Sequence, residues 1–156
     1  MKKISFLSKL RDKGSLEFVE GSVEVEKSYK TKSDSYIGSS KLLLENQKLE
    51  EAVSLAYYSM YYILLSLLFK VGIKCENHSA SIIILKEVFE VDNTDIFYAK
   101  TERIDKQYYV NFKVTKHDVE DLIKKAEKFR RDLQDFIARL NSEKIENCRK
   151  KLESLL

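Results

Sequence analysis

Apolar residues recur at intervals of three and four along most of this chain, which is the spacing of a buried helix face. The first 20 residues are less regular: a short amphipathic segment contains Phe6, Leu7 and Leu10, and an irregular arm follows it. We therefore expect an N-terminal arm over residues 1–21 and a helical domain over residues 22–156.

Two long helices are predicted after the arm. The first begins at Gly21-Ser22, where the serine can cap the helix and the acidic residues that follow suit its positive end. It runs to about Glu45 as an amphipathic helix, in which mostly three- and four-residue spacings separate Val25, Tyr29, Lys32, Tyr36, Leu43 and Leu44. A tight turn at "NQK" leads into a second helix over about residues 48–71, which Gly72 can close.

Further helices follow in the second half of the chain. Asn77 is the natural cap of a short apolar helix, "SASIIILKEVFE", which "VDNT" ends, and Thr94 can cap another helix that runs to about Tyr108. The last long helix starts at "TKHD", with Asp118 at its positive end. Its apolar face consists of Val119, Leu122, Ile123, Ala126, Phe129, Leu133, Phe136, Ile137 and Leu140, and the spacing continues, after a slip at Asn141-Ser142, through Ile145, Cys148, Leu152, Leu155 and Leu156.

This organisation predicts one all-α domain, an up-and-down bundle of four to five helices with a short N-terminal arm. A chain of 156 residues is long enough to bury a core of its own. It has no proline and only four glycines, so strong helix breakers are few and long helices are favoured.

Residues 52–69 contain no charged side chain, and the length of this stretch just reaches that of a membrane span. The stretch also holds four tyrosines and three serines, and the apolar stripes of the other helices need a surface to cover them. A helix that is apolar all round is typical of the centre of a bundle. We therefore interpret this stretch as a core helix and expect no membrane association.

Charge and cysteine content narrow the function classes. The net charge is +3, from 28 basic and 25 acidic residues that are interspersed, which gives weak support for a polyanionic partner. Cys75 and Cys148 match neither a disulfide framework nor a zinc spacing, which predicts free thiols in a reducing cytosol. The N-terminus lacks the apolar core of a secretory signal. We expect a cytoplasmic protein that uses no metal and no cofactor.

Common catalytic motifs are absent: the sequence has no Gly-rich phosphate loop, CxxC, HExxH or GxSxG. One region that stands out is "KCENHSAS", at the start of a predicted helix. Free backbone N–H groups and a partial positive charge at a helix N-terminus let His78, beside Asn77 and Ser79, bind a phosphate or carboxylate. In the simpler interpretation Asn77 caps the helix and His78 only packs in its first turn.

The second region is "KTERIDKQYYV". On a helix, Arg103 shares one face with Gln107, and Asp105 shares another with Tyr109. A guanidinium beside amide and phenol groups suits phosphate or nucleobase contacts, and a solvated helix end with ion pairs is the alternative. Four tyrosines precede both regions, with Tyr57 and Tyr61 on one helix face and Tyr58 and Tyr62 on the next. They are more typical of core or dimer packing than of base stacking.

Three stretches of the chain, in their order, resemble the HEPN superfamily, in particular its small stand-alone archaeal and bacterial branch. They are "EEAVSLAYYSMYYILLSLLFKVGIKCENHSASIIILKEVF", "KTERIDKQYYV" and "VTKHDVEDLIKKAEKF". Members of this branch have an alanine- and tyrosine-rich second helix, a "GI…H-S" loop, an arginine followed by Asp and Tyr, and a helix with "A-E-x-F". The resemblance covers residues 22–140.

The resemblance implies a bundle of four to five helices that is usually dimeric and often paired with a small nucleotidyltransferase in a toxin–antitoxin system. Many HEPN proteins are metal-independent ribonucleases that use an arginine and a histidine four to six residues later. Here Arg103 is followed at those positions by Gln107, Tyr108 and Tyr109, so the usual general acid or base is missing. Among the histidines only His78, from another helix, is left as a substitute.

Three hypotheses follow from these patterns. The first is a binding module with little or no catalysis, which binds a nucleotide or RNA through Asn77, His78, Arg103, Asp105, Gln107, Tyr108 and Tyr109. The second is a ribonuclease in which Arg103 stabilises the phosphate and His78 or Tyr109 transfers protons. The third is a structural helical adaptor.

Two geometric expectations come with these hypotheses. The order of helices predicts that His78 and Arg103 meet in a cleft at one end of the bundle. The surplus apolar surface of the tyrosine-rich helix and of the last long helix predicts a two-fold dimer interface.

Overall fold

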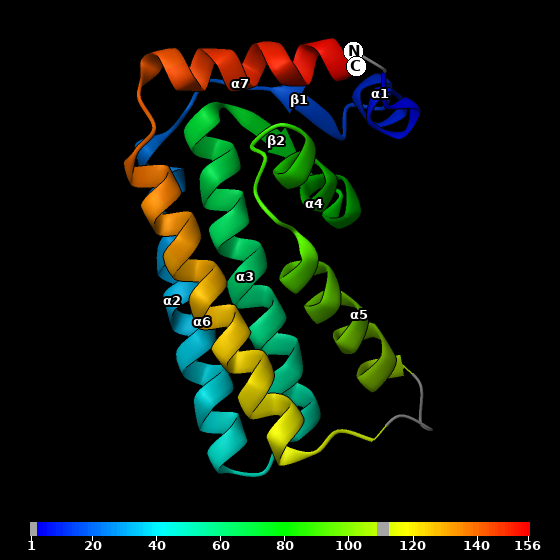
Figure 1. Ribbon diagram of the computed structural model, residues 1–156, viewed down its shortest axis with the longest axis vertical. Coiled ribbons are helices and arrows are strands. Elements are labelled where there is room, and N and C mark those ends of the chain that lie inside the picture. The colour runs from blue at the N-terminus through cyan, green and yellow to red at the C-terminus, as the bar shows by residue number, and fades with distance from the viewer. Residues whose placement is uncertain (1–2, 109–112) are drawn as a thin grey trace.

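The computed structural model describes residues 3–108 and 113–156. Within these residues the chain forms seven helices and one two-stranded sheet (Figure 1). The elements are α1 (Ser5–Asp12), β1 (Leu16–Phe18), α2 (Val23–Glu45), α3 (Leu49–Val71), β2 (Ile73–Cys75), α4 (His78–Glu87), α5 (Thr94–Tyr108), α6 (Lys116–Ala138) and α7 (Ser142–Leu155).

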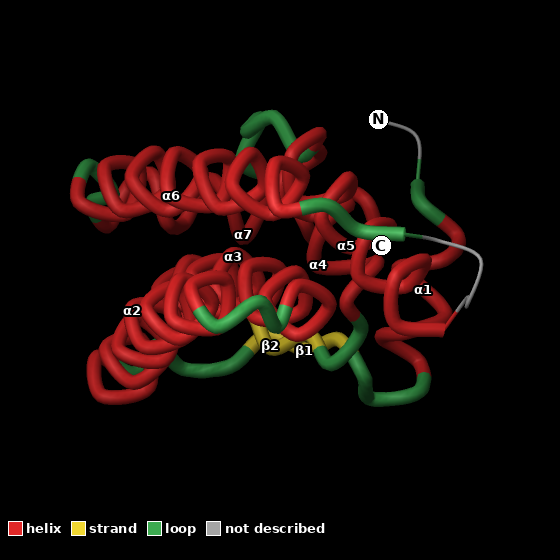
Figure 2. Tube along the Cα trace, turned by 90° about the horizontal axis from the view of Figure 1, so that it is seen from below, coloured by secondary structure: helices red, strands yellow, loops and turns green. Residues whose placement is uncertain are grey.

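Four long helices, α2, α3, α5 and α6, run up and down beside one another (Figure 1). Seen along the bundle, α6 lies over α2 and α3, with α4 and α5 to one side (Figure 2). The predicted all-α, up-and-down bundle is therefore confirmed, and the number of helices is slightly higher than expected.

The centre of the bundle is α3, the helix that the sequence marks as apolar all round. Fourteen of its residues are buried, among them Tyr57, Met60 and Leu64. It is the one helix among the described residues that is long and apolar enough to cross a membrane, and 67% of its most apolar window is buried inside the protein. Burial of that extent is also what the core helix of a bundle requires.

Local capping chemistry sets most helix boundaries. Ser22 accepts a hydrogen bond from the backbone N–H of Val25 and so begins α2, as predicted. At "TKHD", Thr115 and Asp118 form a capping box at the start of α6. Thr94 was predicted to cap α5, but it is the first residue of that helix. Its hydroxyl donates to the Asp92 side chain at 2.6 Å.

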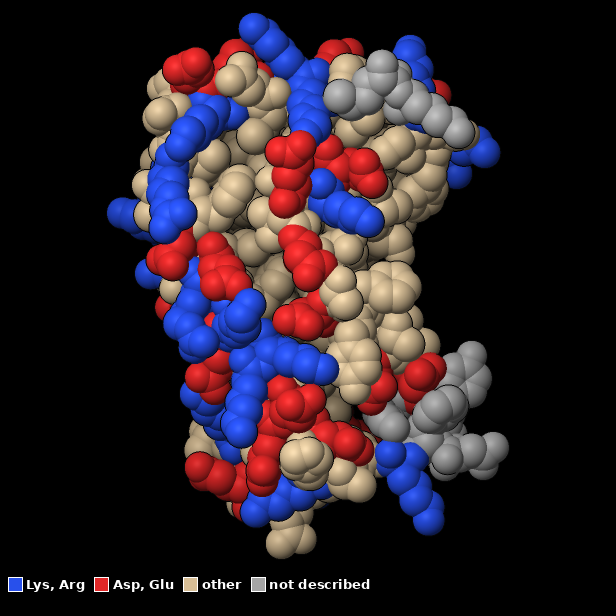
Figure 3. All heavy atoms as spheres, in the orientation of Figure 1, with Lys and Arg blue, Asp and Glu red and all other residues tan. Residues whose placement is uncertain are grey.

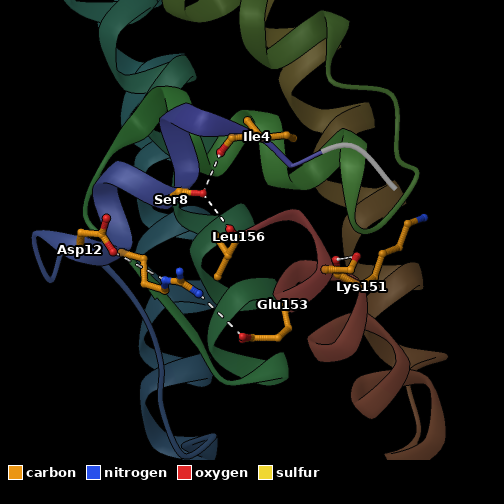
Figure 4. A network of polar contacts seen from close by, with 8 residues as sticks. Ile4, Ser8, Asp12, Lys151, Glu153 and Leu156 are labelled. Carbon is orange, nitrogen blue, oxygen red and sulfur yellow. Dashed lines mark hydrogen bonds and ion pairs between the residues drawn. The ribbon is translucent and has the colours of Figure 1, made fainter.

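The N-terminal arm is more ordered than the sequence suggested. Leu16–Phe18 forms strand β1, which pairs antiparallel with β2, so that Leu16 lies opposite Cys75. Before the strand, α1 packs on the last helix: the Ile4 N–H donates to the Leu155 carbonyl at 2.7 Å, and the Ser8 hydroxyl donates to the Leu156 carbonyl at 2.9 Å (Figure 4). The expectation of an irregular arm was wrong because its hydrogen-bond partners lie far away in the sequence.

The last long helix is divided in two. Helix α6 ends at Ala138, and the Asn141 side chain caps a new helix by accepting from the Lys144 N–H at 2.9 Å. Helix α7 then lies across the end of the bundle (Figure 1). The apolar spacing does continue through it, but Leu152 and Leu155 are buried at the end of the bundle and not along its side.

The single chain covers most of the apolar surface that was expected to need a second copy. The inward face of α6 is already buried, with Val119, Leu122 and Leu133 at most 2% exposed. We expected the apolar face of α6 to stay uncovered in a single chain. That expectation was wrong, because α2, α3 and α5 all pack against α6. A dimer stays a prediction, and its support is confined to the aromatic surface described below.

Candidate functional site

His78 is the first residue of α4, and the residue before it caps that helix. The Asn77 side chain accepts a hydrogen bond from the Ala80 N–H at 2.9 Å. Gly72 prepares this position: its left-handed backbone, with φ of 81°, ends α3 and turns the chain into β2. The capping role that the sequence suggested for Asn77 is therefore confirmed.

The His78 ring lies against two tyrosines of α3. Its Nδ1 is 2.8 Å from the Tyr57 hydroxyl. Its ring stacks on Tyr61, with 3.8 Å between the ring centroids and 21° between the planes. Tyr57 is fully buried and Tyr61 is 5% exposed, whereas His78 is half-buried. The imidazole is thus held on one side by the core and keeps part of its surface open.

Arg103 of α5 approaches the same group of tyrosines. One of its terminal nitrogens donates to the Tyr58 hydroxyl at 3.1 Å. Its guanidinium carbon lies 5.3 Å from the centre of the Tyr58 ring and 5.4 Å from that of Tyr57. A cation over two aromatic faces is attracted by both rings and is held in place by them. Tyr57 therefore contacts both His78 and Arg103.

A second cation of α5 joins this group. The Lys100 ammonium donates to the Ser79 hydroxyl at 2.6 Å, which links α5 to the first turn of α4. Lys100 was not among the predicted site residues. The signal was present, because Lys100 and Arg103 are three residues apart and so lie on one helix face.

Electrostatics keep the imidazole neutral and the phenols protonated. Burial is the largest cause that lowers the pKa of His78, and the nearby Arg103 and Lys100 lower it further. Burial, with Tyr61 as the next cause, raises the pKa of Tyr57 well above its usual value. Burial likewise raises the pKa of Tyr61 to about 12. At neutral pH the fixed positive charges of the site therefore come from Lys100 and Arg103.

The meeting point of these residues differs from the one predicted. Chain order suggested that His78 and Arg103 meet in a cleft at one end of the bundle, but their tyrosine partners lie in the middle part of Leu49–Val71. The reason is that strand β2 and the extended residue Asn77 carry the chain back from the end of α3, so that α4 begins beside Tyr57 and Tyr61. A groove of about 280 Å³ lies elsewhere, between α2, α3 and α6.

The remaining predicted site residues are placed less fully. Asp105 is half-buried on α5. Gln107 and Tyr108 end that helix, and their side chains, together with the whole of Tyr109, lie outside the described part of the structure. His117 is exposed near the start of α6. Their part in binding or catalysis stays a prediction.

A row of aromatic rings extends the site onto α2. Tyr58 and Tyr62, one turn apart on α3, have ring centroids 6.5 Å apart. From α2, Tyr36 stacks on Tyr62 at 5.2 Å and Tyr29 does so at 5.9 Å. These four tyrosines are half-buried, so each keeps some ring surface open to solvent. Tyr29 and Tyr36 were predicted only as helix-face positions, because nothing local in the sequence links α2 to α3.

This arrangement has the chemistry of an anion site with an aromatic border. Two cations and an imidazole lie beside half-buried tyrosine rings, which suits a phosphate with an attached base. In residues 3–108 and 113–156 no group of three or more His, Cys, Asp or Glu side chains is arranged to hold a metal ion. Cys75 and Cys148 are both free thiols, as expected.

Comparison with known proteins identifies the family. The family model described as HEPN domain matches residues 26–153, which is most of the chain. This match covers α3, α4 and α5, the helices that carry the site. No curated protein matches the chain. The chain belongs to the HEPN domain family.

Proposed function

We propose that this HEPN chain is a binding module that holds a nucleotide or a single-stranded RNA at His78, Lys100 and Arg103. The observation that carries the proposal is the position of Arg103, whose guanidinium is fixed over the rings of Tyr57 and Tyr58. A preorganised guanidinium loses little freedom when it binds a phosphate, and Lys100 adds a second positive charge nearby. The half-buried tyrosines Tyr58 and Tyr62 would border a base with the parts of their rings that stay exposed.

The overall charge of the protein adds little to this proposal. Lys and Arg side chains are interspersed with Asp and Glu over the face seen in Figure 3, and a mostly uncharged area lies over α4 and the upper part of α5. Binding is therefore expected to depend on a few placed side chains and not on a broad positive field.

We also propose that the chain acts in the cytoplasm as a homodimer and pairs with a small nucleotidyltransferase, as in toxin–antitoxin systems. Support for the dimer comes from the half-buried row of Tyr29, Tyr36, Tyr58 and Tyr62. Support for the pairing comes from the family. Co-expression with a nucleotidyltransferase encoded next to this gene, followed by size exclusion, tests the pairing, and two separate peaks would count against it.

Binding is tested by fluorescence anisotropy with a labelled single-stranded RNA and with a labelled adenine nucleotide. Replacing Arg103 with alanine is expected to weaken binding about tenfold or more, because a charge-assisted hydrogen bond is lost. For RNA it should also lower the salt dependence by about 0.7 in log–log slope, the share of one phosphate contact. The matched control is Arg131→Ala, which removes the same charge from an exposed position of α6. Equal affinities for the two variants would refute the assignment.

A ribonuclease is the second candidate, and one contact favours it. Tyr57 touches both His78 and Arg103, so a proton-carrying group and a phosphate-binding group lie beside each other although they come from different helices. Incubation of the protein and of Arg103→Ala with total RNA separates the two functions. Cleavage by the wild type alone would favour the enzyme, and no cleavage by either would favour the binding module. Equal cleavage by both proteins would exclude Arg103 from catalysis.

A further inference from the structure

The contact between Tyr57 and His78 fixes more than the position of the imidazole. The Tyr57 side chain is fully buried, and its hydroxyl lies 2.8 Å from Nδ1 of His78. Stacking on Tyr61 sets the plane of the same ring. Helix α3 therefore determines both the tilt of the His78 ring and the partner of one of its two nitrogens.

The direction of this hydrogen bond follows from the surrounding groups. Tyr57 and Tyr61 face the imidazole from α3, the cations of Lys100 and Arg103 face it from α5, and Ser79 and Ser81 belong to its own helix. Burial raises the pKa of the phenol and, with the two cations, lowers the pKa of the imidazole. The buried Tyr57 hydroxyl has no other hydrogen-bond partner among the described residues, and a buried O–H needs an acceptor, so it donates to Nδ1, which accepts with its lone pair. A neutral imidazole then carries its single proton on Nε2.

We propose that Tyr57 is a positioning residue that holds His78 in the tautomer protonated on Nε2, so that His78 offers an anionic ligand a hydrogen-bond donor and not a base. The statement about the ligand rests on the proposed function, whereas the statement about the tautomer does not. The inference also bears on the two candidate functions. A histidine locked in this form suits the binding of a phosphate oxygen, and it lacks the free Nε2 lone pair that abstraction of a proton would need.

The tautomer can be measured directly in the full-length protein. The chain has only two histidines, so a spectrum correlating the ring nitrogens of ¹⁵N-labelled protein with the carbon-bound ring protons contains two ring systems, and the exposed His117 serves as the internal reference. At pH 7.5 we expect a pyridine-like Nδ1 and a pyrrole-like Nε2 for His78. A proton on Nδ1, or ring nitrogen shifts averaged between the two tautomers, would overturn the proposal.

Two variants separate positioning from packing. Replacing Tyr57 with phenylalanine removes the hydroxyl and keeps the ring, and His78 should then show a mixture of tautomers. Replacing Tyr61 with phenylalanine keeps the stacked ring and should leave the tautomer unchanged. The idea fails if Tyr57→Phe retains the wild-type ring pattern. The measurement on the wild type decides the tautomer even if Tyr57→Phe does not fold.

The role toward a ligand is tested with inorganic phosphate and with adenosine monophosphate. Binding of either should shift the Nε2 resonance of His78 while Nδ1 stays pyridine-like. Glutamine at position 78 retains a donor N–H near the place of Nε2, so His78→Gln should bind within a few-fold of wild type, while His78→Ala should lose about tenfold. An unshifted Nε2 with the tautomer intact would contradict the proposed ligand site and leave the positioning by Tyr57 standing. Equal losses in His78→Gln and His78→Ala would refute the donor role.

Discussion

Arg149 Nη1 lies 2.8 Å from the carbonyl oxygen of Gly72 and donates a hydrogen bond to it. The same nitrogen lies 3.1 Å from the Val71 carbonyl and 3.2 Å from that of Val19. A cation at the carboxyl end of α3 is also favoured by the dipole of that helix. This side chain of α7 thus binds both the end of α3 and the residue that follows β1. Gly72 directly precedes β2, the strand that leads to His78.

Replacing Gly72 with alanine is expected to destabilise the protein. The left-handed backbone alone costs about 1–2 kcal/mol for a residue with a Cβ. The new methyl group would also press on the Arg149 guanidinium and on the Val19 carbonyl oxygen, which adds to the loss. The free energy of unfolding from urea denaturation measures the effect.

The matched control is Gly38→Ala, because Gly38 lies inside α2 with nothing within 4 Å of the added carbon. That change should stabilise the protein by about 0.5–1 kcal/mol through helix propensity. If both variants changed stability in the same direction, the role assigned to Gly72 would be wrong.

Asn77 is expected to act on stability as a helix cap. Asn77→Ala should cost about 1 kcal/mol of unfolding free energy, because the Ala80 N–H loses its acceptor. Asn77→Ser should recover most of that loss, since serine caps almost equally well. Nucleotide affinity of the serine variant then decides the second role. Affinity equal to wild type would limit Asn77 to capping, and a loss would place it in the binding site.

The protonation of His78 should make stability depend on pH. The folded state lowers the pKa of His78 below its unfolded value of about 6.5, so the unfolded chain takes up the proton first as the pH falls. The stabilising contribution is therefore complete above pH of about 6.5 and decreases as the pH falls below that value. Urea titrations between about pH 7.5 and 5.5 should show this decline, and His78→Gln should flatten it.

The dimer prediction now depends on the tyrosine row of α2 and α3. Light scattering should give about twice the monomer mass of 18.3 kDa. Tyr62→Glu places a charge in the middle of the row and should shift the protein to the monomer. Phe97→Glu, at a position of α5 that is 61% exposed, should not do so. A monomer mass for the wild type at high protein concentration would contradict the prediction.

The sequence by itself determined the helices and most of their ends. The spacing of apolar residues located α2, α3 and α6, and Ser22, Gly72 and Asn77 marked boundaries that the structure has at the same places. These features can be predicted because a helix and its caps are made by hydrogen bonds between residues at most four positions apart. The apolar composition of residues 52–69 likewise identified the central helix.

Tertiary structure alone decided which residues meet. Strand β1 exists only because β2 supplies its hydrogen bonds, and α7 turns across the bundle because Leu152 and Leu155 are buried there. The contact of His78 with Tyr57, and that of Arg103 with Tyr58, depend on the rotation of α4 and α5 about their axes against α3. That rotation is set by packing among side chains far apart in the sequence, which no local pattern records.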